Sequence, residues 1–134
     1  GHATDLGHLN RSLAEAFSRC RTLLIESNHD LGLLRDGPYP WALKERILGP
    51  EGHLSNRDVA SYLERGLGPG CRHVVLAHLS ETNNHPELAL GSAEDALSRA
   101  GRGDVRLELT GRHGTGWLEV GDRRAAPSGQ MRLW

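Results

Sequence analysis

Four polar residues that can bind a metal ion or move a proton stand at the ends of predicted strands or just before a predicted helix. They are Asp5, Glu26, His53 and His78. Glu26 directly follows the apolar run 23–25, and His78 follows the apolar run 74–77. An acid and a histidine supply ligands suited to zinc or manganese, and a second acid and histidine can form a proton-transfer pair. These residue types therefore indicate metal-assisted hydrolysis.

Each of the four residues also has a purely structural interpretation. Asp5 suits a helix N-cap, Glu26 suits a solvated turn, and His53 suits a surface position beside a cap. His78 fits a core histidine that is satisfied by a backbone carbonyl. Each structural interpretation is favoured when its residue is taken alone. All four residues, however, fall where one edge of a parallel sheet would collect them, and that coincidence favours a site.

The elements that would position these residues alternate between strand and helix. Apolar periodicity predicts a first strand of which only the end, at 3–5, is visible, and further strands at 22–25 and 74–79. It predicts helices at 9–19, 42–48, 56–67 and 86–99. The last third predicts a small antiparallel tail with strands at 105–109, 117–120 and 131–134. The alternation implies an α/β fold with a largely parallel sheet, in which ligands gather beyond the carboxyl ends of the strands.

Length and composition limit the class of protein. The 134 residues predict one domain, and the formal net charge of -1 offers no global attraction for nucleic acid or an anionic membrane, which leaves room for a local basic groove. The sequence has neither a membrane-length apolar run nor the features of a secretion signal, so we expect a cytoplasmic protein without a membrane partner. Cys20 and Cys71 are expected to be reduced thiols, with a bridge between them as the less favoured alternative.

The wording of the motifs resembles the metallo-β-lactamase superfamily of metallohydrolases, and most closely its bacterial YycJ/WalJ-type branch. The order of the motifs follows the tRNase Z branch. The resemblance covers about residues 1–100 and rests on Ala3-Thr4-Asp5, on Leu23-Leu24-Ile25-Glu26-Ser27-Asn28-His29-Asp30, on Gly52-His53-Leu54-Ser55, and on His78-Leu79-Ser80-Glu81-Thr82-Asn83-Asn84. It implies that residues 1–134 are the carboxyl-terminal half of an αββα sandwich, with a motif-bearing part at 1–100 and a β-rich tail at 101–134.

The resemblance also implies a mechanism. Two divalent ions, zinc or manganese, would activate a water for attack on a phosphodiester of a nucleic-acid substrate. Asp5 would bridge both ions and His78 would complete the second, while Glu26 and His53 would form the proton-transfer pair. Three further residues would either bind the substrate or hold His78, namely Ser80, Asn83 and Asn84. His29 belongs to the motifs without an assigned role.

The chain lacks a counterpart of the family's principal metal motif, H-x-H-x-D-H, and of a further histidine ligand. We therefore expect this chain alone to be inactive and to need a missing amino-terminal half of the fold as its partner. An uncovered sheet face would make the isolated chain marginally stable or self-associating. Two alternatives stay open: a non-catalytic binding module derived from the same fold, and a thioester or lactam hydrolase. The Glu26 and His53 pair resembles the phosphodiesterase branch more closely.

Overall fold

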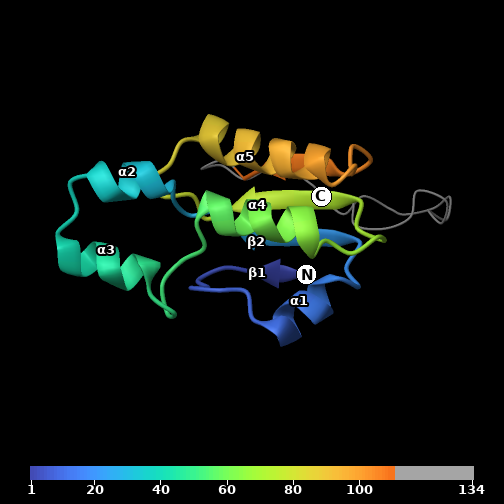
Figure 1. Cartoon of the computed structure of the whole chain (residues 1–134), viewed down its shortest axis with the longest axis horizontal. Coiled ribbons are helices and arrows are strands. Elements are labelled where there is room, and N and C mark those ends of the chain that lie inside the picture. Colours follow the sequence, from blue (N-terminus) through green and yellow to red (C-terminus); the bar gives the residue numbers. More distant parts are fainter. Residues whose placement is uncertain (111–134) are drawn as a thin grey trace, which may run out of the picture.

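The computed structural model describes residues 1–110, in which strands and helices alternate (Figure 1). The elements in order are β1 (His2–Ala3), α1 (Arg11–Phe17), β2 (Thr22–Glu26), α2 (Leu31–Asp36), α3 (Trp41–Leu48), α4 (Asn56–Arg65), β3 (His73–Ala77), α5 (Pro86–Arg99) and β4 (Arg106–Leu109). The predicted strands at 117–120 and 131–134 lie outside the described residues. The α/β class is confirmed, whereas the half-sandwich stays a prediction.

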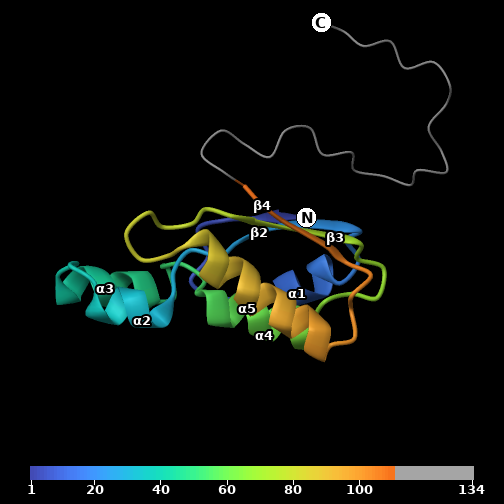
Figure 2. The ribbon, with the colours of Figure 1, turned by 90° about the horizontal axis from the view of Figure 1, so that it is seen from above.

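The four strands form one parallel sheet in the order β1-β2-β3-β4. Each strand pairs with the next strand of the chain, because one helix, or three between β2 and β3, returns the backbone to the same starting edge. Helices α1, α4 and α5 lie on one face of the sheet (Figure 2). All four carboxyl ends of the strands therefore point the same way and meet at one edge.

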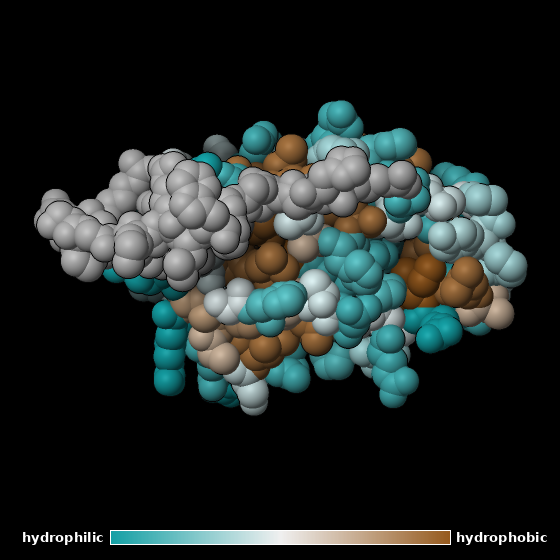
Figure 3. Space-filling view, turned by 180° about the vertical axis from the view of Figure 1, so that it is seen from behind, coloured by the Kyte–Doolittle hydropathy of each residue, from teal (hydrophilic) through white to brown (hydrophobic). Residues whose placement is uncertain are grey.

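Alternating side chains of the two central strands build the core. Leu23 and Ile25 of β2 and Val74 and Leu76 of β3 are fully buried and join one cluster with α4 and α5. Leu24 and Val75 pair in register and, by the alternation of a strand, point to the opposite face, where apolar surface is visible (Figure 3). Self-association through that face stays a prediction. The core holds the strand ends in fixed positions.

Three local features differ from the sequence-based expectations. β3 ends at Ala77 rather than at 79, because the next residue, His78, takes a positive φ of 56°. Helix α2 was not expected; Asp30 starts it by accepting hydrogen bonds from two backbone amides. The antiparallel pairing expected for 105–109 is wrong, since β4 pairs in parallel with β3 after the return through α5.

Helices α2 and α3 project beyond the carboxyl ends of the strands (Figure 1). We call residues 31–48 the arm. Lys44, the chain's single lysine, is buried between the two helices and donates hydrogen bonds to the carbonyls of Arg35 at 2.6 Å and Gly37 at 2.8 Å. These bonds link α3 to the end of α2, so they hold the two helices of the arm together. No helix in the described part of the chain has the length and apolar character needed to cross a membrane.

Candidate metal centre

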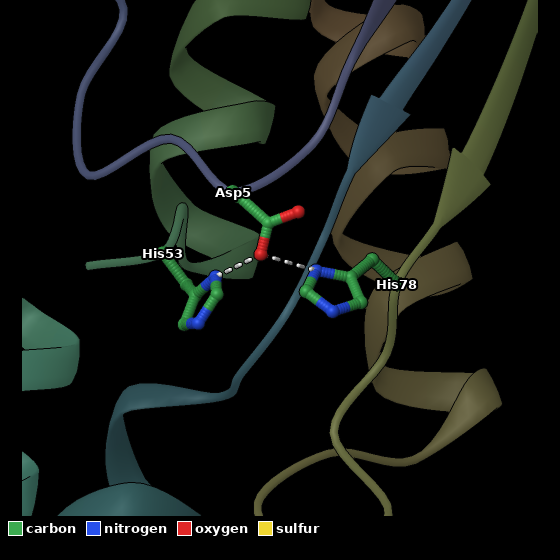
Figure 4. Close-up of side chains that lie close together, drawn as sticks. All are labelled: Asp5, His53 and His78. Carbon is green, nitrogen blue, oxygen red and sulfur yellow. Dashed lines mark ion pairs between the residues drawn. The ribbon is translucent and has the colours of Figure 1, made fainter. Parts of the chain in front are cut away.

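Asp5, His53 and His78 converge at the carboxyl edge of the sheet (Figure 4). Asp5 follows β1, His78 follows β3, and His53 lies in the loop that leads into α4. One ligand atom from each of the three lies within 4.8 Å of the others. The Asp5 Oδ1 atom is 3.9 Å from the Nδ1 atom of each imidazole. The fold thus brings together residues that are far apart in the sequence.

The backbone is strained at two of these three positions. Asp5 has a φ of 60° and His78 a φ of 56°, and they are the two non-glycine residues with positive φ in the described range 1–110. The left-handed conformation costs an ordinary residue about 1 to 2 kcal/mol, so the surrounding structure must hold it. Around His78, the Asn28 side chain donates to the His78 carbonyl at 2.9 Å, and the Ser80 amide donates to the Asn28 carbonyl at 2.8 Å.

Glu26 lies beneath the site, is fully buried and accepts four hydrogen bonds. Its Oε1 atom accepts from the backbone amides of Leu6 at 2.7 Å and Leu54 at 3.1 Å. Its Oε2 atom meets Nδ1 of His53 at 3.1 Å and Nδ1 of His78 at 2.9 Å. The sequence paired Glu26 with His53 alone. With a proton on each Nδ1, the carboxylate sets the tautomer of both imidazoles and leaves each Nε2 atom with a lone pair.

A second polar network lies beside the first and is closed to solvent. Ser27, Asn56 and Asn84 are at most 4% exposed. Ser27 Oγ donates to Asn56 Oδ1 at 2.7 Å, the two amides exchange hydrogen bonds at 2.9 Å, and Asn84 Nδ2 also donates to the Ser27 carbonyl at 2.8 Å. The network joins the same three loops that carry Glu26, His53 and His78. We call it the asparagine network.

Sequence reasoning missed Asn56, although a signal was present. Asn56 precedes Val59, Ala60 and Leu63 at the spacing of the buried face of α4. A polar residue on an otherwise apolar helix face is expected to have a buried partner. The partner of Asn56 is 28 residues away in the sequence, so the pattern indicates that a partner exists without naming it.

The three predicted substrate contacts occupy different places. Ser80 lines the cavity beside His78, and its Oγ atom accepts from the Asn83 amide at 3.1 Å. Asn83 is 1% exposed, and its side chain has no hydrogen-bond partner in the structure. The bonds of Asn84 favour the alternative in which it holds the loop of His78. Contact with a substrate stays a prediction for all three.

His29, which had no assigned role, lies beside both networks. Its side chain is buried, and neither ring nitrogen has a hydrogen-bond partner in the structure. Burial lowers the pKa of His29, and the nearby charge of Asp58 opposes that shift in part. The ring is therefore a buried group for which the neutral form is favoured.

The candidate centre opens into a cavity of about 470 Å³. One wall carries Asp5, His53, His78 and Ser80, and the arm supplies Tyr39, Leu43, Arg46 and Ile47. A second hollow, also of about 470 Å³, is lined by His78 as well, together with residues at the start of α5 and at the end of β4.

The comparisons with known proteins agree with the motifs. Over 100 residues, which are 75% of this chain, the sequence is 42% identical to exodeoxyribonuclease WalJ of Streptococcus pneumoniae and 38% identical to exodeoxyribonuclease YycJ of Bacillus anthracis. The matched part spans 37% and 38% of the length of these curated relatives. No protein-family model and no solved structure matches the chain. The resemblance to the YycJ/WalJ-type branch is confirmed.

Proposed function

This chain belongs to the family of the exodeoxyribonucleases WalJ and YycJ, and on that premise we propose that it forms part of a metal-dependent nuclease that hydrolyses phosphodiester bonds in DNA. The chain spans little more than a third of its relatives, so the activity of the whole protein is part of the proposal. The observation that carries it is the convergence of Asp5, His53 and His78, two of which keep a strained backbone. Such strain persists where it serves a site.

The side chains fit a divalent transition-metal ion such as zinc or manganese. A carboxylate oxygen from Asp5 and an imidazole nitrogen from His78 are the ligand types that these ions take. Glu26 accepts the Nδ1 proton of His78, and this arrangement orients an imidazole for binding through Nε2. An ion held by these residues would lower the pKa of water and would so supply hydroxide near neutral pH. The second ion of the family's two-metal mechanism would draw its remaining ligands from outside the described residues.

His53 is proposed as the acid that completes the cleavage. In its doubly protonated form it donates Nδ1–H to Glu26 and keeps a proton on Nε2. As the bond between phosphorus and the leaving oxygen breaks, that oxygen takes the Nε2 proton, and the imidazole becomes neutral. Glu26 does not contact the reacting atoms. It positions His53 and His78 together, because both imidazoles meet the same carboxylate oxygen.

Metal titration of the isolated chain tests the proposed ligands. We expect calorimetry with manganese chloride to show binding by the wild type and a loss of at least tenfold in affinity for Asp5→Ala and His78→Ala. His8→Ala is the matched control, because His8 is exposed and lies outside the cavity. Unchanged manganese binding by His78→Ala would overturn the proposal.

The role of His53 is tested in the full open reading frame that encodes this sequence. We expect His53→Ala to keep manganese affinity within about threefold, whereas hydrolysis of a labelled deoxyoligonucleotide slows about 10² to 10⁴-fold. A variant that loses metal affinity as strongly as His78→Ala would make His53 a ligand instead of the proton donor. Hydrolysis of a thioester or lactam with DNA left intact would contradict the proposed substrate.

A further inference from the structure

Asn28 lies on the wall of the cavity at the metal centre but is only 8% exposed. It follows Glu26 in the loop between β2 and α2. Its side chain is an uncharged amide, which donates and accepts hydrogen bonds but does not titrate. A group of this kind is suited to holding other residues in place.

Three hydrogen bonds of Asn28 reach the two loops that carry the imidazoles. Its backbone amide donates to the carbonyl of Leu54, the residue after His53, at 2.9 Å. Its backbone carbonyl accepts from the Ser80 amide at 2.8 Å, and its side-chain Nδ2 atom donates to the His78 carbonyl at 2.9 Å. Asn28 therefore connects the loop of His53 to the loop of His78, although both are distant from it in the sequence.

The backbone turn at His78 decides where its imidazole points. Side chains alternate along a strand, so an extended residue at this position would point to the same side as Leu76, into the core. The left-handed φ of 56° breaks that alternation. The His78 side chain is instead 43% exposed, and its Nδ1 atom lies 2.9 Å from Oε2 of Glu26. The direction of the imidazole thus depends on the left-handed conformation.

The left-handed conformation of His78 needs support from outside the residue. It is disfavoured because the Cβ atom of an ordinary residue then comes close to the carbonyl oxygen that follows. The carbonyl of His78 is the group that Asn28 Nδ2 holds. The other two bonds of Asn28 run through its backbone, so only the bond to His78 depends on which side chain stands at position 28. A substitution at Asn28 can therefore remove this support alone.

The two imidazoles form a close pair, and their spacing depends on the two loops. Their ring centroids are 5.1 Å apart at an interplanar angle of 69°, which is an edge-to-face arrangement. Both Nδ1 atoms meet the same oxygen of Glu26. A rotation of the His78 backbone would move one ring out of this pair and away from the carboxylate. Since Asn28 is bonded to both loops, it is placed to prevent such a rotation.

We propose that Asn28 is a positioning residue of the metal centre, and that its side chain keeps His78 in the left-handed conformation. In this role Asn28 sets the place of the Nε2 atom of His78 without contacting the ion. The inference rests on the proposed function, in which His78 binds the metal ion. It adds a residue outside the ligand set on whose hydrogen bond the ligand geometry depends. Replacing a residue that supports a ligand in this way lowers metal affinity.

Asn28→Leu tests the inference, because leucine has a similar shape to asparagine but no hydrogen-bond donor. We expect calorimetry with manganese chloride to show an affinity about 10- to 100-fold below that of the wild-type chain. Asn10→Leu is the matched control. Asn10 is exposed, lies outside the cavity and accepts a hydrogen bond of the same 2.9 Å length at the start of α1. That variant should keep manganese affinity within about twofold although it loses its helix cap.

A second substitution makes the test independent of how well leucine is tolerated. Asn28→Ser keeps a polar side chain, but its hydroxyl is one bond shorter than the amide and does not reach the His78 carbonyl. We expect it to lose manganese affinity as well. The visible spectrum of bound cobalt(II), which reports ligand geometry, should change in both Asn28 variants and stay the same in Asn10→Leu. A crystal structure of either Asn28 variant should show His78 with a negative φ and its Nδ1 atom away from Glu26.

Two results would overturn the inference. One is wild-type manganese affinity with the wild-type cobalt spectrum in either Asn28 variant. The other is a lower affinity while His78 keeps its left-handed φ and its contact with Glu26, because the side chain of Asn28 would then act on the ion itself. A failure of the proposed function looks different: manganese binding by the wild-type chain would not depend on His78.

Discussion

Two polar networks in this chain come from the same three loops but differ in their exposure to solvent. Glu26, His53 and His78 form one, and Ser27, Asn56 and Asn84 form the other. The first is open, with His53 and His78 side chains 27% and 43% exposed, whereas each member of the asparagine network is at most 4% exposed. In the same loops, some side chains are thus open to solvent and available to a ligand, and their neighbours hold the loop in place.

The comparison shows which contacts hold the left-handed backbone of His78 in place. His78 keeps a left-handed backbone, and six residues later Asn84 fastens the same loop to Ser27 and Asn56. A closed network with satisfied donors and acceptors rigidifies its surroundings. The imidazoles of the open network each keep one ring nitrogen that Glu26 does not contact, and this nitrogen is available to a ligand. The asparagine network stabilises the loops that carry His53 and His78.

The largest expected effect comes from breaking the closed network. Asn56→Ala removes the partner of Ser27 Oγ and two of the bonds of the Asn84 side chain, which keeps the Ser27 carbonyl and the His85 amide. We expect the free energy of unfolding to fall by about 3 kcal/mol in urea titrations. The exposed Arg57→Ala, one position along α4, is the control and should change stability by less than about 0.5 kcal/mol. If the folded Asn56→Ala variant lost more free energy of manganese binding than free energy of unfolding, the division between the two networks would be wrong.

The next effect separates binding from stability. Glu26→Gln keeps an oxygen for the amides of Leu6 and Leu54 but replaces the shared acceptor of both imidazoles with an NH₂ group. Each Nδ1 atom must then accept, which moves the proton to Nε2 and removes the lone pair that a metal needs. We expect manganese affinity to fall about 10- to 100-fold in calorimetry while the unfolding free energy changes by less than about 1.5 kcal/mol. Unaltered affinity would mean that Glu26 does not set the tautomers.

Sequence patterns predicted the elements more fully than the contacts between them. The helix at 86–99 was predicted with its observed bounds, since Pro86 is suited to a first turn. The end of β3 was placed too late, because Leu79 continues the apolar run while only the backbone angle of His78 breaks it. Helix α2 was missed because its cap, Asp30, is hidden in the polar motif after β2.

The candidate site shows the same limit. A parallel sheet predicts that residues after successive strands meet at one edge, as Asp5 and His78 do, and the loop before α4 brings His53 to the same edge. The link from Glu26 to His78 spans 52 residues, and no local pattern encodes it. The αL backbone of Asp5 was equally invisible, since aspartate is common in many loop conformations. Long-range polar pairing is set by the packed core, which a single sequence does not specify.

His29 provides a pH-dependent test of how tightly the loops are closed. Burial lowers its pKa, so the unfolded chain binds a proton below about pH 6.5 before the folded chain does. The contribution of neutral His29 to the free energy of unfolding is therefore fully present above about pH 6.5. It falls as the pH is lowered, by about 1 kcal/mol per pH unit, until His29 of the folded chain also takes up a proton. Urea titrations from pH 7.5 to 5.5 should show that His29→Leu has a shallower decline than the wild type. Parallel declines would mean that water reaches the ring.

The smallest effect tests how well the closed network tolerates the loss of one member. Ser27→Ala removes a donor to Asn56 Oδ1, but that oxygen still accepts from Asn84 Nδ2 at 2.9 Å, and the Ser27 carbonyl keeps its own bond from Asn84. Because no buried group loses its last partner, we expect a loss of about 1 kcal/mol in urea titrations, well below that of Asn56→Ala. Manganese affinity should not change. A loss as large as that of Asn56→Ala would show that the hydroxyl, and not the paired amides, holds the loops beneath the metal centre.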